Sequence, residues 1–168
     1  MLGIKFTDRA RGLHLHIYEL DTPSVVIDLD VLERNIEEMA AHCRDLGITL
    51  RGHTKSHKNP EIAKMQVAAG SQGIVCQKLG DAENMARSGL DDILMTYNIV
   101  GRQKVRRLTE LARLRRMTVT VDSLAVAAGI SEQAAIDNVT VGVLVEIDTG
   151  GKRPGVQSPA AAEELANS

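Results

Sequence analysis

Residues 48–78 read ITLRGHTKSHKNPEIAKMQVAAGSQGIVCQK, and this stretch determines the expected fold. The apolar start of 48–55 and the run at 73–78 each predict a β-strand. Between them, Pro60 predicts the first turn of a helix. Nothing between the strands resembles a hairpin turn, so the stretch predicts two parallel strands joined by a crossover helix.

The same alternation continues in both directions along the chain. Further strands are predicted at 24–30, 92–98, 117–123 and 139–148, and a helix follows each of them. From residue 48 onward this makes about five βα units, which predicts an α/β fold with a parallel sheet. Two architectures fit this order: an open doubly wound sheet, or a partial (β/α)8 barrel. Residues 1–20 are predicted to be irregular.

Composition and charge restrict the class of protein. The chain has 168 residues, of which 43% are hydrophobic and 25% charged, as is typical of a soluble globular domain. Its net charge of −2 gives no general attraction for nucleic acid or an anionic membrane, so neither partner is expected. Cys43 and Cys76 are too few for a disulfide framework or a cysteine zinc site, and they suit a reducing compartment. Because we find no secretory signal and no apolar run that spans a bilayer, we expect a cytoplasmic protein.

Polar residues gather where each predicted strand ends. The carboxyl ends of parallel strands form one edge of the sheet, and the ligand sites of both architectures lie at that edge. The residues in question are His53, Lys55, His57, Lys58, Gln77, Lys78, Thr96, Asn98, Asp122, Glu146 and Asp148. The alternative interpretation is that strand ends meet loops, and loops are polar in any protein.

One strand is unusual because it carries a row of cations. Strand alternation would place Arg51, His53, Lys55 and His57 on one face. Neighbouring cations favour the neutral form of a lysine, and the neutral amine is the nucleophile toward aldehydes. The pattern therefore supports the hypothesis that Lys55 forms a Schiff base. Two alternatives stay open: a basic strand end that binds phosphate, and a solvated edge with its cations in water.

Four motifs together resemble one group of enzymes. DTPSVVIDLDVLERNI, LRGHTKSHK, GIVCQKLGDAENMARSGLDDILMTYNIV and VEIDTGGKRPGV occur in this order between Asp21 and Val156. They resemble the D-threonine aldolase and eukaryotic-type D-serine dehydratase group of the alanine racemase-like, fold-type III pyridoxal phosphate enzymes. The resemblance implies a (β/α)8 TIM barrel of alanine racemase type, with 1–23 as an N-terminal extension and 24–168 as a truncated barrel domain. One departure is Gly52, where the family usually has proline.

The resemblance also implies roles for individual residues. Lys55 matches the lysine that condenses with the aldehyde of the cofactor, and His53 lies beside it as a second catalytic residue. Arg153 matches the arginine that reaches the phenolic oxygen of the cofactor. Gln77 and His57 match positions near the pocket, so both are predicted to bind the cofactor, with a substrate-side position as the alternative for His57.

The implied activity is that of a pyridoxal phosphate-dependent lyase of the D-threonine aldolase type, which cleaves a D-3-hydroxy-amino acid to glycine and an aldehyde. The alternatives are a D-serine dehydratase-type ammonia-lyase, an amino-acid racemase, a non-catalytic pyridoxal phosphate-binding protein and an inactive remnant.

The length of the chain bears on all of these activities. A complete barrel typically needs about 250 residues, so three strands and a C-terminal β domain are expected to be missing. Full-length relatives are expected to use a divalent metal whose ligands lie in those missing parts, and we predict no metal ligand in this chain. A homodimer is expected for the complete protein.

Overall fold

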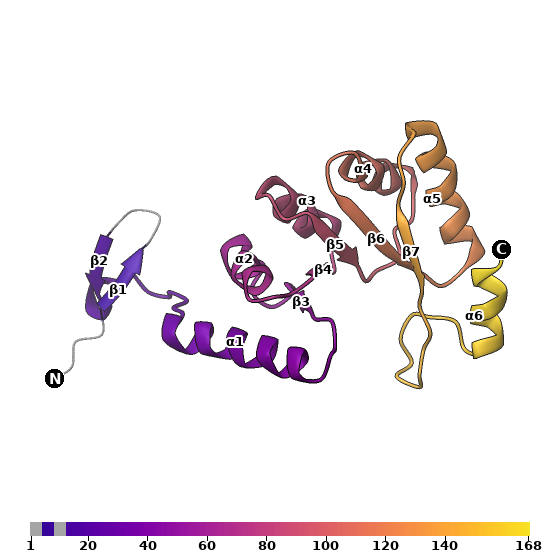
Figure 1. Cartoon of the computed structure of the whole chain (residues 1–168). Coiled ribbons are helices and arrows are strands. Elements are labelled where there is room, and N and C mark those ends of the chain that lie inside the picture. Colours follow the sequence, from indigo (N-terminus) through magenta and orange to yellow (C-terminus); the bar gives the residue numbers. More distant parts are fainter. Residues whose placement is uncertain (1–4, 9–12) are drawn as a thin grey trace. The chain divides into compact units, whose positions relative to one another are not determined.

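The computed structural model of the chain describes residues 5–8 and 13–168 (Figure 1). The chain divides into two compact units, one that ends at Arg34 and one that covers Asn35–Ser168. Among the described residues, no helix combines the length and the apolar character needed to cross a membrane.

The first unit begins with a short antiparallel pair of strands, β1 (Lys5–Asp8) and β2 (Leu13–His16). A short 3-10 helix, η1 (Ile17–Glu19), follows directly. The prediction that residues 1–20 are irregular is therefore wrong for these segments. The weak alternation of LHLHIYEL belongs to a strand that pairs with an earlier part of the chain.

The strand predicted at 24–30 does not form. Residues 24–28 belong to no helix or strand, and α1 (Leu29–Asp45) begins at the end of the expected strand. Asp28 explains this early start, because its side chain accepts a hydrogen bond from the N–H of Val31 at 3.1 Å. A side-chain acceptor at this position satisfies an N–H group that has no helical partner, and it thereby favours the start of a helix.

The second unit contains a five-stranded parallel sheet whose strand order is the chain order, β3-β4-β5-β6-β7. The strands are β3 (Arg51–His53), β4 (Gly73–Cys76), β5 (Asp92–Met95), β6 (Arg116–Val121) and β7 (Gly142–Val145). The helices are α2 (Pro60–Ala68), α3 (Leu79–Arg87), α4 (Arg102–Ala112), α5 (Leu124–Asp137) and α6 (Pro159–Ala166).

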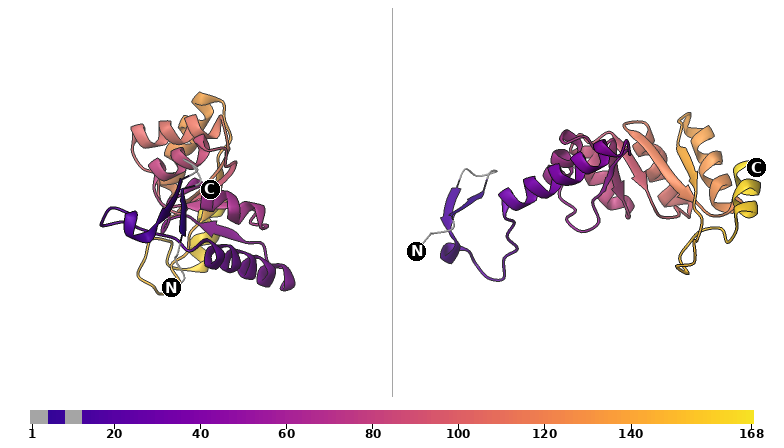
Figure 2. Two further views of the ribbon diagram at one scale, coloured as in Figure 1. Left: turned by 90° about the vertical axis from the view of Figure 1, so that its left-hand side faces the viewer. Right: turned by 60° about the horizontal axis from the view of Figure 1, so that its bottom comes forward.

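Helices α2 to α5 follow one another along one side of this sheet (Figures 1 and 2). Helix α2 packs on β3 and β4, α3 on β4 and β5, and α4 and α5 both pack on β6. Neighbouring helices also pack on each other, α3 on α4 and α4 on α5. A doubly wound sheet reverses its strand order and carries helices on both faces, whereas a barrel keeps the order and has one outer helix layer. The predicted partial (β/α)8 barrel is therefore confirmed.

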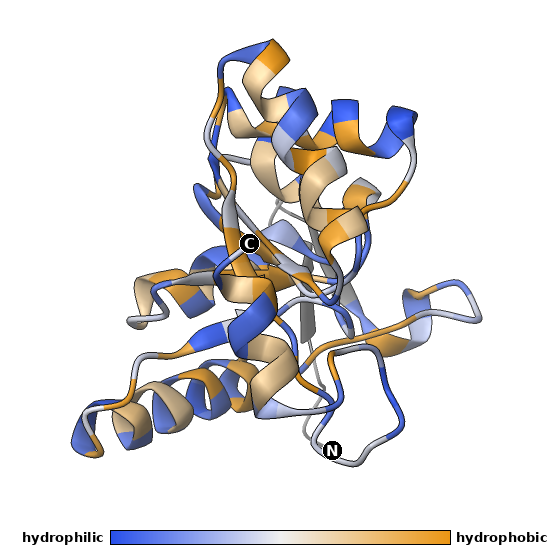
Figure 3. Ribbon diagram, turned by 90° about the vertical axis from the view of Figure 1, so that its right-hand side faces the viewer, coloured by the Kyte–Doolittle hydropathy of each residue, from blue (hydrophilic) through white to orange (hydrophobic). Residues whose placement is uncertain are grey.

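The face of the sheet toward the helices forms the hydrophobic core. Alternate positions of the three central strands point to this face, as strand geometry requires. The strand residues are Ile74, Cys76, Ile93, Met95, Met117, Val119 and Val121, each at most 1% exposed. Burying one large apolar side chain contributes about 1.5–3 kcal/mol, so this layer stabilises the unit. The helix ribbons correspondingly change between hydrophobic and hydrophilic residues along their length (Figure 3).

The opposite face carries a charged group at the amino ends of the strands, which we call the amino-edge cluster: Arg51, Gly73, Asp92 and Arg116. Arg51 donates two hydrogen bonds to Asp92, at 2.7 and 3.0 Å, and Arg116 lies 3.8 Å from the same carboxylate. β4 separates the strands of Arg51 and Asp92, and Gly73 lies in the path between them. A Cβ on Gly73 would be 2.6 Å from the Arg51 guanidinium and 2.4 Å from the Asp92 carbonyl oxygen. Glycine therefore makes room for an ion pair that crosses a strand.

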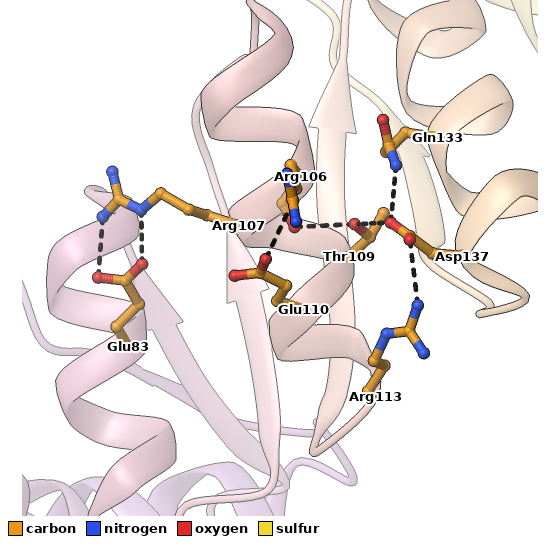
Figure 4. Close-up of polar contacts among 8 residues, drawn as sticks. All are labelled: Glu83, Arg106, Arg107, Thr109, Glu110, Arg113, Gln133 and Asp137. Atoms are coloured by element: carbon orange, nitrogen blue, oxygen red, sulfur yellow. Dashed lines mark hydrogen bonds and ion pairs between the residues drawn. The ribbon is translucent and has the colours of Figure 1, made fainter.

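Hydrogen-bonded charges also link the outer sides of α3, α4 and α5 (Figure 4). Arg107 of α4 donates to Glu83 of α3 at 2.7 and 2.8 Å. Asp137 at the end of α5 accepts from Thr109 at 2.6 Å and from Arg113 at 3.0 Å. The hydrogen bond from Arg107 holds the pKa of Glu83 below its usual range, and the one from Thr109 does the same for the pKa of Asp137. These contacts join the helices that cover the core.

Candidate functional site

The turn that follows β3 carries Lys55 beyond the end of the strand. Thr54 is fully buried and anchors this turn to β4, since its N–H and its hydroxyl donate to the Val75 carbonyl at 2.9 and 3.0 Å. Lys58 closes the turn, because its N–H donates to the Thr54 carbonyl at 2.7 Å. The strand predicted over 48–55 is therefore too long. Lys55 lies on a hydrogen-bonded turn at the carboxyl edge of the sheet.

His53 and Lys55 lie together and are both exposed. The backbone N–H of Lys55 donates to Nδ1 of His53 at 3.2 Å. In the neutral imidazole the proton is therefore on Nε2, and Nε2–H can donate a hydrogen bond to another group. Burial lowers the pKa of His53, and the positive charge of Lys55 lowers it further. A neutral His53 thus presents a hydrogen-bond donor next to an exposed amine.

His57 is turned toward the start of α2. Its Nδ1 accepts a hydrogen bond from the N–H of Asn59 at 3.0 Å, and Asn59 in turn caps α2. Its Nε2 is buried and has no hydrogen-bond partner among the described residues. Burial lowers the pKa of His57, whereas Asn59 and the side chain of Gln66 act in the opposite direction. The predicted single row of Arg51, His53, Lys55 and His57 is therefore broken, because His57 follows a turn and contacts a helix.

Gln77 directly follows β4 and is half-buried. Because Ile74 and Cys76 point into the helix-facing core, strand alternation places Gln77 on the opposite face, as it does His53 on the neighbouring strand. Tyr97 comes shortly after β5 at the same edge and is 52% exposed. Three consecutive strands therefore bring polar groups to one edge.

Arg153 lies on a loop that follows β7 and is exposed. The loop closes on itself, since the N–H of Val156 donates to the Glu146 carbonyl at 2.8 Å and the N–H of Asp148 donates to the Val156 carbonyl at 3.0 Å. Gly155 has a φ of 131°, and a Cβ there would be 2.5 Å from the Asp148 nitrogen. This glycine is thus required by the loop's own backbone. The loop extends beyond the carboxyl end of β7 (Figures 1 and 2).

The structure brings His53 and Lys55 into contact, places Gln77 on the next strand, and holds Arg153 apart from them. β3 and β7 are the outer strands of the sheet. Lys55 and Arg153 therefore follow strands at opposite ends of the strand order, with three strands between them.

One polar side chain near this edge, Gln66 of α2, was not predicted from the sequence. Its Oε1 is buried without a hydrogen-bond partner among the described residues. Asn98, which was predicted from its place at a strand end, likewise has a buried Oδ1 without a partner among them. For Gln66 the available sequence signal was the glycine at position 52, whose Cα lies directly under the amide. Within the described part of the chain, no group of three His, Cys, Asp or Glu side chains could hold a metal ion.

A parallel sheet in chain order, one layer of helices and polar residues at the carboxyl edge define the class. The chain is part of a (β/α)8-barrel protein with its candidate site at the edge where such barrels bind ligands.

Sequence comparison identifies the family. The family model described as alanine racemase, N-terminal domain, matches residues 27–168, and the chain belongs to this family. The resemblance drawn from the four motifs is thereby confirmed.

Three relatives illustrate the similarity. The chain is 38% identical to the 3-hydroxy-D-aspartate aldolase of Paracoccus denitrificans over 150 residues, which cover 88% of the chain and 39% of the relative. It is 38% identical to the D-threo-3-hydroxyaspartate dehydratase of a Delftia species, over 82% of the chain and 36% of the relative. The crystal structure of D-threonine aldolase from Filomicrobium marinum superposes with a TM-score of 0.88 at 40% identity, over 90% of the chain and 41% of that protein. The chain thus spans 36% to 41% of the length of these proteins.

Proposed function

We propose that this chain supplies the lysine-bearing barrel part of a pyridoxal phosphate-dependent lyase of the D-threonine aldolase type. The proposed substrate is a D-3-hydroxy-amino acid, which is cleaved to glycine and an aldehyde. One observation carries the proposal: a chain 38% identical to an aldolase presents Lys55 on an exposed turn at the carboxyl edge of its sheet.

The residues at this edge fit an anionic aldehyde such as pyridoxal phosphate. Lys55, Lys58, Lys78 and Arg153 are all exposed, and none of them forms an ion pair with another described residue. Their charges are therefore available to an anion, and the Lys55 amine is accessible for condensation with an aldehyde. When bound, the cofactor would supply the electron sink for breaking a bond at the amino-acid Cα.

Three side chains have separate roles in this proposal. Lys55 holds the cofactor through its Nζ. His53 donates a hydrogen bond from Nε2 to a ligand oxygen, since its Nδ1 is occupied by the N–H of Lys55. Arg153 lies on the hydrogen-bonded loop after β7, from which its guanidinium can donate to an oxygen of the cofactor. Gln77, on the strand next to His53, is a further hydrogen-bonding group on the same face.

A dehydratase acting on the same substrate class is the second candidate. The identity to the Delftia dehydratase, 38%, equals the identity to the Paracoccus aldolase. A dehydratase removes the α-proton and the β-hydroxyl, and it releases ammonia and a 2-oxo acid. An aldolase breaks the Cα–Cβ bond instead. We favour the aldolase because the D-threonine aldolase structure superposes with a TM-score of 0.88 at 40% identity, whereas the structure of the Delftia dehydratase superposes with a TM-score of 0.76 at 35% identity.

The proposal also includes several properties of the whole protein. These are a homodimer, a divalent metal bound outside this chain, a cytoplasmic location, and no nucleic-acid or membrane partner. We further propose 1–23 as an extension and 24–168 as the barrel domain.

Reductive labelling tests the role of Lys55. The chain is mixed with pyridoxal phosphate and treated with borohydride, and the modified peptides are identified by mass spectrometry. We expect the pyridoxyl group on Lys55, its loss in Lys55→Met, and its retention in the matched control Lys58→Met. Equal labelling of several surface lysines would contradict a specific site.

Product analysis separates the two candidate reactions. Incubated with D-threonine, the full-length protein should release glycine and acetaldehyde in equal amounts. Release of ammonia with 2-oxobutanoate would instead identify the dehydratase.

A further inference from the structure

The turn that carries Lys55 contains an unexplained pair of buried polar atoms. Nε2 of His57 and Oε1 of Gln66 are both buried, and neither has a hydrogen-bond partner among the described residues. A buried polar group without a partner is costly, by about 1–3 kcal/mol, so such atoms are usually paired. Two of them in adjacent segments call for an explanation.

The chemistry of the two atoms is complementary. Nδ1 of His57 accepts the hydrogen bond from the N–H of Asn59, so in the neutral ring the proton is on Nε2. Burial lowers the pKa of His57 and thereby favours this neutral form. Nε2 is therefore a donor, whereas Oε1 of Gln66 is an acceptor. The Gln66 side chain also lies close enough to the ring to act on its pKa, in the direction of a hydrogen bond.

Gly52 provides the space in which Gln66 lies. A Cβ on Gly52 would be 2.8 Å from Oε1 of Gln66, 2.9 Å from Cδ and 3.1 Å from Nε2. The amide group thus rests directly on the glycine Cα. A proline here would occupy this space and would also remove the N–H that Gly52 donates to Ser71 at 3.0 Å. The absence of a side chain at position 52 therefore permits the placement of Gln66.

We propose that Nε2–H of His57 donates a hydrogen bond to Oε1 of Gln66 and that Gln66 is a positioning residue for the turn of Lys55. The link attaches the turn to α2, while Thr54 attaches its other end to β4. The Lys55 amine then stands on a turn that is held at both ends. Its relevance to cofactor binding rests on the proposed function, but the link itself does not.

Amide hydrogen exchange of the purified chain tests the link without any cofactor. Gln66→Met removes the acceptor at similar side-chain length, and Gln66→Glu keeps an acceptor oxygen. In Gln66→Met, we expect the amides of Lys58 and Asn59, which are hydrogen-bonded within the turn, to exchange about tenfold faster. In Gln66→Glu they should exchange nearly as in the unmodified chain. The Thr96 amide, bonded to the Cys76 carbonyl between β4 and β5, should be unaffected and serves as the control.

Gly52→Ala gives a second, independent measurement. Its methyl group should displace the Gln66 amide and accelerate the same two amides, but it should have no such effect in the Gln66→Met background. Unchanged exchange in Gln66→Met would overturn the proposal. Equal acceleration at Thr96 would also overturn it, because the whole fold would then be loosened. Failure to label Lys55 with pyridoxal phosphate in every variant would contradict the proposed function alone.

Discussion

Both edges of the sheet carry cationic side chains, but among the described residues only those at the amino edge have an ion-pair partner. At the amino edge, Arg51 and Arg116 share the carboxylate of Asp92. At the carboxyl edge, Lys55 and Lys78 are exposed and have no ion-pair partner in the part of the chain that the structure describes. In barrel proteins, the amino edge contributes stability and the carboxyl edge holds the ligand. The difference in pairing therefore separates the charges that hold the fold from those available for binding.

The comparison predicts the largest effect at Gly73. Gly73→Ala should lower the free energy of unfolding by about 3 kcal/mol, because the new Cβ overlaps the Arg51 guanidinium and the Asp92 backbone. Urea unfolding followed by circular dichroism measures this change. The control is Gly80→Ala in α3, where a Cβ meets nothing within 4 Å and the free energy should rise by about 0.5 kcal/mol. An equal loss of unfolding free energy in Gly73→Ala and Gly80→Ala would contradict a stabilising role of the amino-edge cluster.

The ion pair itself should have the next largest effect. Asp92→Ala leaves Arg51 partly buried without its partner, and it should cost about 2 kcal/mol of unfolding free energy. Asp91→Ala is the matched control, since Asp91 is exposed, and its cost should stay below about 0.5 kcal/mol.

The Arg51→Met/Asp92→Leu double variant sharpens this second test. Replacing both partners by apolar groups should recover part of the loss in the same urea unfolding measurement. If the two substitutions were simply additive, the pair would not act as a unit.

The smallest effect on stability is expected at the carboxyl edge. Lys55→Met should change the free energy of unfolding by less than about 0.5 kcal/mol, because this exposed side chain has no ion-pair partner to lose. The same change should raise the pKa of His53, since the Lys55 charge contributes to lowering it. NMR titration of the His53 ring measures the direction, with Lys58→Met as the control that leaves it unchanged. A fall in the pKa of His53 would contradict the described contact.

The same pKa shift contributes to how stability depends on pH, in the same direction as the lowered pKa of His57. Because the pKa of His53 is lowered in the folded chain, the unfolded chain binds more protons, and stability should fall as the pH drops below about 6.5. In Lys55→Met this fall should be smaller. Unfolding free energies at neutral and mildly acid pH would show whether the two curves differ.

The number and direction of the core strands were predicted from the sequence, whereas element ends were not. Alternation of apolar strands with helices predicted five parallel strands, because each unit is defined by local periodicity and turn residues. It left the doubly wound sheet and the barrel as alternatives, and the barrel was expected only from the family resemblance. The strand at 24–30 failed because Asp28 begins a helix instead. The strand at 48–55 was drawn too long because the turn at Thr54 depends on hydrogen bonds to Val75, which lies on another strand.

In the candidate site, contacts between residues close in sequence were predictable, and contacts between residues far apart in sequence were not. The closeness of His53 and Lys55 follows from their spacing in the chain. The partner of Arg51 does not, because Asp92 lies 41 residues away and is reached only across a glycine. Gln66 escaped notice for the same reason, since its amide meets Gly52 only after α2 packs on β3. Side chains that act through packing need the assembled sheet before they can be identified.

The half-exposed ring of Tyr97 gives this chain a natural optical probe. The sequence contains no tryptophan and two tyrosines, so its tyrosine emission comes from Tyr97 and Tyr18 alone. Tyr97 stands at the same edge as Gln77, whereas Tyr18 belongs to the other compact unit. A chromophore that binds near Tyr97 should quench this emission. In a Tyr18→Phe variant, all of the tyrosine emission would come from the edge where Lys55 lies.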